Sequence, residues 1–185
     1  MAAGKTEALE ALERLGAATV SSDAIVHELL GGEELRDLLI ARFGRNVAPD
    51  GEVDRAAVAE MVFGDEEARD WLESQLWPRV GERIAAWREE LAERAQPPRA
   101  AVVEVPLLFE AEMETGFDAT VAIVAEDPLR EQRAGARGHA GVDSRARRQL
   151  PQEEKARRAD YVVDNDGDLA DLERKMSQVM DEVTA

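Results

Sequence analysis

Gly4, Lys5 and Thr6 are the first residues of the chain whose types and spacing could do chemistry. They match the G-K-[ST] ending of a phosphate-binding P-loop. In such a loop the N–H groups of the first helical turn point at phosphate oxygens, and the helix dipole favours their negative charge. Lys5 would bridge the β- and γ-phosphates, and the Thr6 hydroxyl would hold Mg²⁺. Three residues alone also suit an ordinary helix start, so the following sequence has to decide.

The elements that would position this loop follow at once. Apolar residues at helical spacing predict a helix over 6–15, which Gly16 would end. Residues 17–21 are small and apolar enough for a buried strand, and Asp23 would cap a helix over 24–30. Because ligands bind at the carboxyl ends of parallel strands, Asp23 is also a candidate site carboxylate.

The rest of the sequence predicts an α/β domain with a helical insertion. Residues 100–105, 120–125 and 161–163 are short apolar runs between helical patterns, which indicates a parallel sheet covered on both faces. Residues 33–44, 54–63, 65–76 and 78–94 favour helices. Asp54 would cap the second of them, Asp65 would start the third, and Pro78 would open the last. Asp168 would cap a final helix that runs to about residue 183.

Composition excludes several classes of protein. The 185 residues contain no cysteine, which rules out disulfides and thiolate chemistry. No apolar run is long enough to cross a bilayer, so we expect a cytoplasmic protein without membrane partners. A net charge of −17 argues against nucleic-acid binding. Residues 128–158 nevertheless hold nine basic and four acidic side chains, a local charge of +5. This segment is either a solvated helix face or an anion site that folds over a polyphosphate.

The ordered motifs resemble one family, the bacterial dephospho-coenzyme A kinases, from end to end. The Pro-Leu-Leu segment and the closing Ala-Asp-Tyr-Val-Val-Asp-Asn run are the most specific. The residues that carry the resemblance are Ala3-Gly4-Lys5-Thr6, Leu15-Gly16, Ser21-Ser22-Asp23, Phe43-Gly44, Asp50-Gly51, Asp54-Arg55, Val62-Phe63, Pro78, Val105-Pro106-Leu107-Leu108-Phe109-Glu110 and Ala159-Asp160-Tyr161-Val162-Val163-Asp164-Asn165-Asp166-Gly167.

The resemblance implies a three-layer α/β/α P-loop NTPase fold with a parallel sheet. It also implies ATP-dependent phosphorylation of the 3′-hydroxyl of dephospho-CoA, the last step of coenzyme A synthesis. Residues 1–30 and 96–185 would then form the nucleotide-binding core, with a lid at about 128–158. Residues 31–95 would form the helical lobe for the CoA substrate. We expect a monomer or a weak homo-oligomer.

Site roles follow from the same resemblance. Asp23 would orient the acceptor hydroxyl or take its proton, and Arg133 and Arg137 would act as lid arginines that neutralise the transferring phosphoryl group. Thr6 and Glu104 are the candidate Mg²⁺ ligands. The candidate ATP-binding residues are Ala2, Ala3, Gly4, Lys5, Thr6, Glu7, Asn165 and Gly167, the last two beside the adenine ring.

Some positions depart from the family pattern. Ser21 replaces an expected Asp, His27 stands where Arg is frequent, and Gln152 and Lys155 stand where arginines are usual. The strand and first glycines of the P-loop do not precede Gly4, for which we expect a start codon assigned too late. Two alternatives therefore stay open: another small-molecule P-loop kinase, or a non-catalytic kinase-like protein that binds CoA or a partner.

Overall fold

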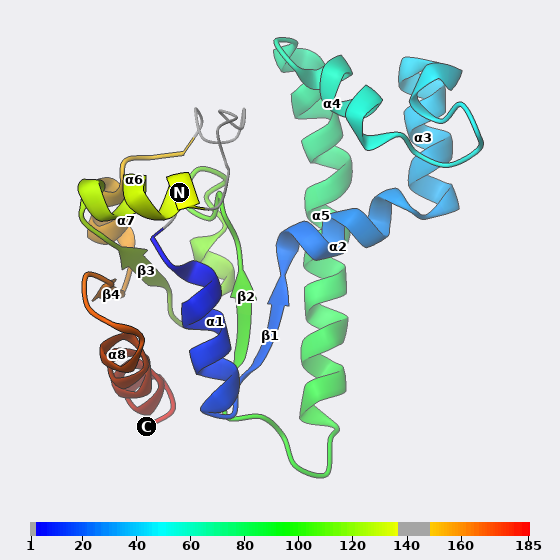
Figure 1. Cartoon of the computed structure of the whole chain (residues 1–185). Coiled ribbons are helices and arrows are strands. Elements are labelled where there is room, and N and C mark those ends of the chain that lie inside the picture. The colour runs from blue at the N-terminus through cyan, green and yellow to red at the C-terminus, as the bar shows by residue number, and fades with distance from the viewer. Residues whose placement is uncertain (1–2, 137–148) are drawn as a thin grey trace. The chain divides into compact units, whose positions relative to one another are not determined.

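The computed structural model describes residues 3–136 and 149–185. The chain divides into two compact units, residues 1–19 with 96–185 and residues 20–95. Figure 1 labels the elements, which are α1 (Lys5–Arg14), β1 (Ala18–Ser21), α2 (Ser22–Leu30), α3 (Glu33–Phe43), η1 (Arg45–Val47), α4 (Arg55–Val62), α5 (Glu66–Ala92), β2 (Ala101–Glu104), η2 (Glu114–Gly116), β3 (Val121–Val124), α6 (Asp127–Ala136), α7 (Gln152–Arg158), β4 (Tyr161–Asp164) and α8 (Leu169–Val183).

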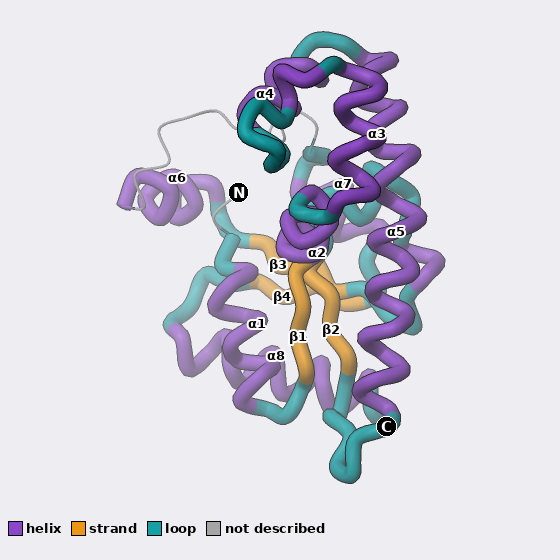
Figure 2. The backbone as a smooth tube through the Cα atoms, turned by 90° about the vertical axis from the view of Figure 1, so that its right-hand side faces the viewer, coloured by secondary structure: helices purple, strands orange, loops and turns teal. Residues whose placement is uncertain are grey.

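The strands lie where the apolar runs predict them. β3 and β4 pair in parallel, in a register that runs from Val121 opposite Tyr161 to Val124 opposite Asp164. β1 pairs with β2 in a second two-stranded sheet. The prediction of an α/β fold with parallel strands is confirmed, and the described strands are arranged as two pairs (Figure 2).

Helices α1 and α8 enclose the core of the first unit. Their apolar faces pack against each other and against strand residues such as Val102, Ile123 and Val163. Met176 of α8 is 1% exposed and Ala11 of α1 is fully buried. On another side of the strands α7 contacts β3. The core of the first unit therefore joins α1 to α8, which lie far apart in the sequence.

Gly16 ends α1 as predicted. Its φ of +95° is a left-handed conformation that a side chain would strain. The Gly16 N–H donates to the Glu13 carbonyl and the Ala17 N–H to the Leu12 carbonyl, both at 3.0 Å. These two bonds form a Schellman motif, which satisfies the last carbonyls of the helix and turns the chain into β1.

The second unit is helical. Leu35, Leu39 and Val47 are among its buried core residues, against which Trp71 packs. Trp71 also meets the Phe43 ring edge-on at 5.3 Å between centroids. Asp54 caps α4 as predicted by accepting the Ala56 N–H at 2.9 Å, and Asp65 caps α5 in the same way.

Two predicted helix starts are wrong. Pro78 does not open a helix but lies inside α5, a continuous helix of 27 residues. Leu76, Val80 and Ile84 are buried at four-residue spacing on both sides of the proline, so side-chain packing outweighs the hydrogen bond that proline removes. Asp23 is not a cap, because α2 begins at Ser22, two residues earlier than predicted, with Ser21 at the N-cap. Asp23 lies in the exposed first turn.

The buried Met176 provides a test of this core. Met176→Ala should lower the free energy of unfolding by about 2–5 kcal/mol, because it removes buried methylenes and leaves a cavity. Urea denaturation measures the change. Met61→Ala is the matched control, since Met61 is 41% exposed and should lose little. Equal losses in the two variants would contradict the assigned core.

Candidate functional site

The turn before α1 has the geometry of an anion-binding helix start. Gly4 is the N-cap with φ +95°, and no side chain caps the helix. The first intrahelical bond runs from the Ala8 N–H to the Gly4 carbonyl at 3.0 Å. The N–H groups before that of Ala8, in the first turn of α1, have no carbonyl one turn earlier to which they could donate. They therefore point out of the N-terminal end of the helix. Backbone donors and the helix dipole thus coincide at Gly4, Lys5 and Thr6.

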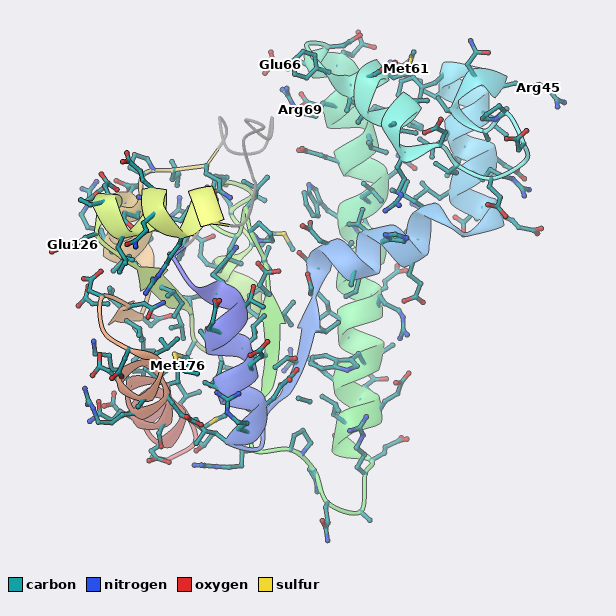
Figure 3. The ribbon with its side chains drawn as sticks, in the orientation of Figure 1. Arg45, Met61, Glu66, Arg69, Glu126 and Met176 are labelled. Carbon is teal, nitrogen blue, oxygen red and sulfur yellow. The ribbon has the colours of Figure 1, made fainter. Side chains whose placement is uncertain are left out.

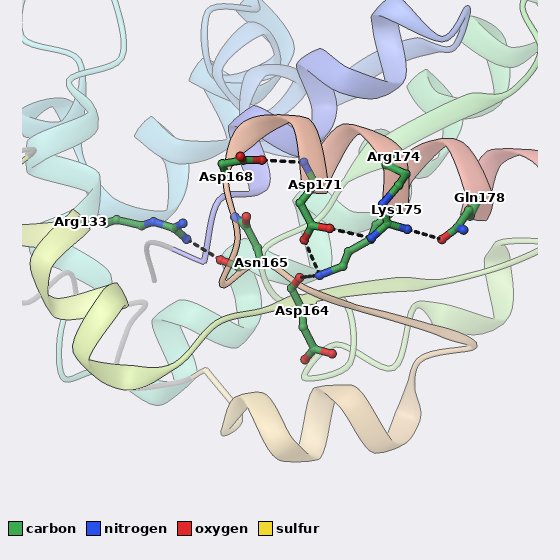
Figure 4. Close-up of polar contacts among 8 residues, drawn as sticks. All are labelled: Arg133, Asp164, Asn165, Asp168, Asp171, Arg174, Lys175 and Gln178. Carbon is green, nitrogen blue, oxygen red and sulfur yellow. Dashed lines mark hydrogen bonds and ion pairs between the residues drawn. The ribbon is translucent and has the colours of Figure 1, made fainter.

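Asn165 holds this turn from the far end of the chain. Its Nδ2 donates to the Ala3 carbonyl at 2.8 Å. A Cβ on Gly4 would lie 2.0 Å from the same nitrogen, so only glycine permits this approach. The Arg133 guanidinium donates to the Asn165 carbonyl at 2.9 Å (Figure 4). Asn165 therefore joins the α1 turn to α6.

A pocket of about 190 Å³ lies at this junction. Five residues singled out in the sequence line it: Gly4, Glu7, Arg133, Asn165 and Gly167. The other lining residues are Asp168, Leu169 and Leu172, which sequence reasoning missed. Leu169 is 54% exposed. It directly follows the predicted loop, and that position was the available signal.

Residues 164–168 are fixed by hydrogen bonds on several sides. The Asn165 N–H donates to the Val124 carbonyl at 2.8 Å, and Lys175 donates to the Asp164 carbonyl at 2.7 Å. Asp168 caps α8 by accepting the Asp171 N–H at 2.9 Å, as predicted. Hydrogen bonds from Lys175 and Arg174 hold the pKa of Asp171 below its usual value. The loop that lines one part of the pocket is therefore held by hydrogen bonds to Val124 of β3 and to α8.

Lys5 and Glu104 form an ion pair. The Lys5 Nζ lies 2.7 Å from the Glu104 Oε1, and the Glu104 side chain is 19% exposed against 46% for Lys5. The carboxylate at the end of β2 thus orients the ammonium of the α1 turn. Thr6, the other candidate metal ligand, is exposed in the first turn of α1.

Glu110 anchors the segment that returns from the basic stretch. Its Oε1 accepts from the Leu150 N–H at 2.7 Å and from Lys155 at 2.9 Å, and Lys155 also donates to the Pro106 carbonyl. Burial raises the pKa of Glu110, but the hydrogen bonds from Lys155 and Leu150 and the Lys155 charge outweigh it and lower that pKa. Gln152 bonds both backbone groups of Ala125. Gln152 and Lys155, the two departures from family arginines, therefore connect α7 to the segments that follow β3 and β2.

Some predicted site residues are not brought together by these contacts. Ala2 and Arg137 lie outside the described residues. Asp23 belongs to the second unit, whereas the pocket belongs to the first. Across residues 3–136 and 149–185, no group of three or more His, Cys, Asp or Glu side chains could hold a metal ion. No helix in these ranges is long and apolar enough to span a membrane.

Comparison with known proteins decides the family. The family model for dephospho-CoA kinase matches residues 1–171. The chain belongs to the dephospho-CoA kinase family. The dephospho-CoA kinase of Moorella thermoacetica is 37% identical over 91% of this chain and 82% of its own length. That of Symbiobacterium thermophilum is 34% identical over 91% of this chain and 72% of its own.

Solved structures show the same fold. The crystal structure of TT1252 from Thermus thermophilus superposes with a TM-score of 0.81 at 33% identity, covering 98% of this chain and 93% of that one. The dephospho-CoA kinase from Campylobacter jejuni gives a TM-score of 0.63 at 25% identity, covering 99% and 93%. The predicted P-loop kinase fold of this dephospho-CoA kinase family member is thereby confirmed.

Gly4→Ala tests the close approach to Asn165. The substitution should destabilise the protein by more than the roughly 1–2 kcal/mol of left-handed strain, because the Cβ also displaces the Asn165 side chain. It should weaken ATP binding as well. Gly51→Ala is the control, since Gly51 has φ +83° and nothing within 4 Å of a new Cβ. Urea unfolding and calorimetric ATP titration measure both effects; indistinguishable variants would contradict the prediction.

Glu110→Gln tests the anchor through pH. The folded pKa lies below the reference value of 4.5, so the carboxylate stabilises the fold above that pH. The stabilisation is lost as pH falls through the folded pKa. At pH 7 the variant should lose about 1 kcal/mol, reduced by solvent screening at Lys155. The difference should vanish in acid, measured by urea unfolding from pH 7 downwards, with the exposed Glu10→Gln as control. A difference independent of pH would refute this assignment.

Proposed function

We propose that this chain transfers the γ-phosphoryl group of ATP to the 3′-hydroxyl of dephospho-CoA, giving coenzyme A and ADP. The bond between the γ-phosphorus and the β–γ bridging oxygen of ATP breaks, and that oxygen leaves with ADP. A bond forms from the 3′-oxygen to the γ-phosphorus, and a base takes the hydroxyl proton. The single observation that carries the proposal is the glycine turn at α1 beside the pocket that Asn165 and Arg133 line. Family membership supplies the substrates.

The donor side of the reaction falls to the first unit. Phosphate oxygens would bind the N–H groups at the start of α1, with Lys5 neutralising charge from the position in which Glu104 holds it. The adenine ring would lie against Leu169 beside Gly167, where an exposed apolar side chain meets a loop without a bulky residue. Arg133 and Arg137 would stabilise charge on the transferring group.

Mg²⁺ is proposed from the chemistry of the donor set. Magnesium in kinases is commonly held by one or two protein oxygens, with substrate phosphates and water completing the shell, so it needs no cage of carboxylates. The Thr6 hydroxyl in the first turn of α1 fits that role. Glu104 fits it less well, because its carboxylate is engaged by Lys5 at 2.7 Å. When bound, the ion would neutralise charge between the β- and γ-phosphates.

Asp23 is the proposed acceptor carboxylate. It lies in the exposed first turn of α2, at the end of β1, in the second unit. There it would orient the 3′-hydroxyl and accept its proton late in the transfer, because phosphoryl transfer depends mostly on positioning. Residues 20–95, which contain it, are proposed to bind the CoA substrate, and the cytoplasm is the proposed site of action, where ATP is available. The state of assembly stays a prediction.

A coupled assay of ADP release tests the function. ATP is supplied with either dephospho-CoA or a nucleoside monophosphate, and the product is identified by mass. Turnover with dephospho-CoA to coenzyme A is expected. Faster turnover of a nucleoside monophosphate would favour another small-molecule kinase, and no turnover with intact ATP binding would favour a non-catalytic protein.

Asp23→Asn isolates the acceptor step. The value of kcat should fall by about 10²–10⁴, because the carboxylate no longer orients the hydroxyl or takes its proton. The affinity for ATP should stay near wild type. Asp50→Asn, in an exposed turn of the same unit, is the control and should leave kcat unchanged. An unchanged kcat in Asp23→Asn would remove Asp23 from the mechanism.

A further inference from the structure

Lys175 of α8 makes two contacts that the proposed mechanism does not use. Its Nζ lies 2.7 Å from the Asp171 Oδ2 and donates to the Asp164 carbonyl, also at 2.7 Å (Figure 4). Asp171 lies one turn earlier on the same helix, whereas Asp164 is the last residue of β4. The ammonium therefore bridges the start of α8 and the end of β4, where the loop that lines the pocket begins.

The second contact distinguishes this pair from an ordinary surface ion pair. A carboxylate and an ammonium four residues apart on a helix stabilise it only slightly. Arg174 shows that ordinary case, because it binds Asp171 at 2.6 Å and otherwise donates to Gln178 of the same helix. The Lys175 side chain is 28% exposed against 57% for Arg174. The more buried of the two cations is thus the one that leaves its own helix to bind the loop.

Lysine is rare in this chain, with three residues against 20 arginines. Lys5 and Lys155 also bind carboxylates, and Lys155 in addition donates to the Pro106 carbonyl. An ammonium carries three donors on one compact atom, so it can bind a carboxylate and a backbone carbonyl together, where a planar guanidinium needs more room. The choice of lysine at position 175 therefore fits a bridging role.

Asp171 supports the wall of the pocket from behind. A Cβ on Gly167 would lie 2.6 Å from the Asp171 Oδ2 and 3.0 Å from its Cβ, so the Asp171 side chain packs directly against the Gly167 backbone. Gly167 itself lines the pocket. Lys175 and Arg174 hold the carboxylate in this position, at 2.7 and 2.6 Å. The place of Gly167 in the wall thus depends on where Asp171 is held.

The core fixes the direction in which this part of α8 faces. Met176, the neighbour of Lys175, is 1% exposed and belongs to the core between α1 and α8 (Figure 3). Leu172, the neighbour of Asp171, is 2% exposed in the same core. Rotation of α8 about its axis would expose both apolar side chains to water. Asp171 and Lys175 are therefore presented to the loop by the packing of the helix.

Asn165, on the phosphate side of the pocket, has separate supports. Its N–H donates to the Val124 carbonyl and its Nδ2 to the Ala3 carbonyl, both at 2.8 Å. Its own carbonyl accepts from Arg133 at 2.9 Å. These three bonds run to β3, to the turn before α1 and to α6, whereas the supports of Gly167 come from α8. The two sides of the pocket can therefore be perturbed separately.

We propose that Lys175 and Asp171 are positioning residues for the base-binding side of the nucleotide pocket. Lys175 holds the end of β4 and Asp171 holds Gly167, so that Gly167 and Leu169 form a fixed wall for the adenine ring. The pair acts on the base and not on the triphosphate. This inference rests on the proposed function, because it takes ATP as the ligand of the pocket. It deepens that function by separating base binding from phosphate binding.

Calorimetric titration with ATP and with tripolyphosphate tests this separation, since tripolyphosphate has neither ribose nor base. Lys175→Met removes the ammonium and keeps an aliphatic side chain. It should raise the Kd for ATP about 2- to 30-fold, the range expected for a supporting residue outside a site, and leave the Kd for tripolyphosphate near wild type. In the ADP-release assay the KM for ATP should rise with kcat unchanged. Lys175→Arg should fall between wild type and Lys175→Met.

Arg174→Met is the matched control, because it removes a cation that binds the same carboxylate but does not bridge to the loop. Its Kd for ATP should stay near wild type. A rise as large as that in Lys175→Met would show that charge beside Asp171 is sufficient, which refutes the bridging role. An equal loss of tripolyphosphate binding, or an unchanged Kd for ATP in a folded Lys175→Met, also refutes the proposal. Thermal melting establishes that each variant is folded.

A double-mutant cycle tests the contact between Asp171 and Gly167. Gly167→Ala should raise the Kd for ATP in the wild-type background, because its Cβ meets the Asp171 carboxylate. In an Asp171→Ala background, which lacks that carboxylate, the same substitution should cost several-fold less. Equal costs in the two backgrounds would overturn the role of Asp171. If the wild-type protein itself binds no ATP, the proposed function fails, which is distinct from a failure confined to these variants.

Discussion

The contact between Gly4 and Asn165 is the constraint on which the rest of the first unit depends. The Asn165 amide reaches the Ala3 carbonyl only because Gly4 has no side chain, and the αL conformation of Gly4 then starts α1. Once α1 is set, its apolar face meets α8. Helix α8 begins at Leu169, two residues after Gly167 closes the turn from β4, with Asp168 as its cap. The shape of the turn before α1 and of the pocket beside it thus both depend on one close approach.

Three described cations of the first unit each have a stated partner. Lys5 is held by Glu104, Arg133 by the Asn165 carbonyl and Lys155 by Glu110. Such pairs contribute little to stability when exposed, but they restrict where a long side chain points. Positioning is what phosphoryl transfer requires, because the protein stabilises charge rather than forming bonds to the substrate. For phosphoryl transfer, fixing the direction of these cationic side chains therefore matters more than the number of cations.

Structural features that depend on only a few neighbouring residues could be predicted from the sequence. The caps at Asp54, Asp65 and Asp168 and the left-handed Gly16 depend on local hydrogen bonds, and all are found. The prediction that a helix starts at Pro78 was wrong because buried residues on both sides of the proline keep α5 continuous. That burial can be seen only in the fold. Lys5 with Glu104 and Gln152 with Ala125 are distant in sequence, and no local pattern pairs them. The same holds for Leu169, whose exposure only the structure shows.

His27 shows why a departure from a family pattern is not necessarily a loss. An arginine at that position would place two guanidinium groups side by side, which repel and share no lone pair. Histidine instead accepts a hydrogen bond from Arg55, so the pair carries one charge with a defined direction. The departure at position 27 therefore keeps a directed contact between α2 and α4.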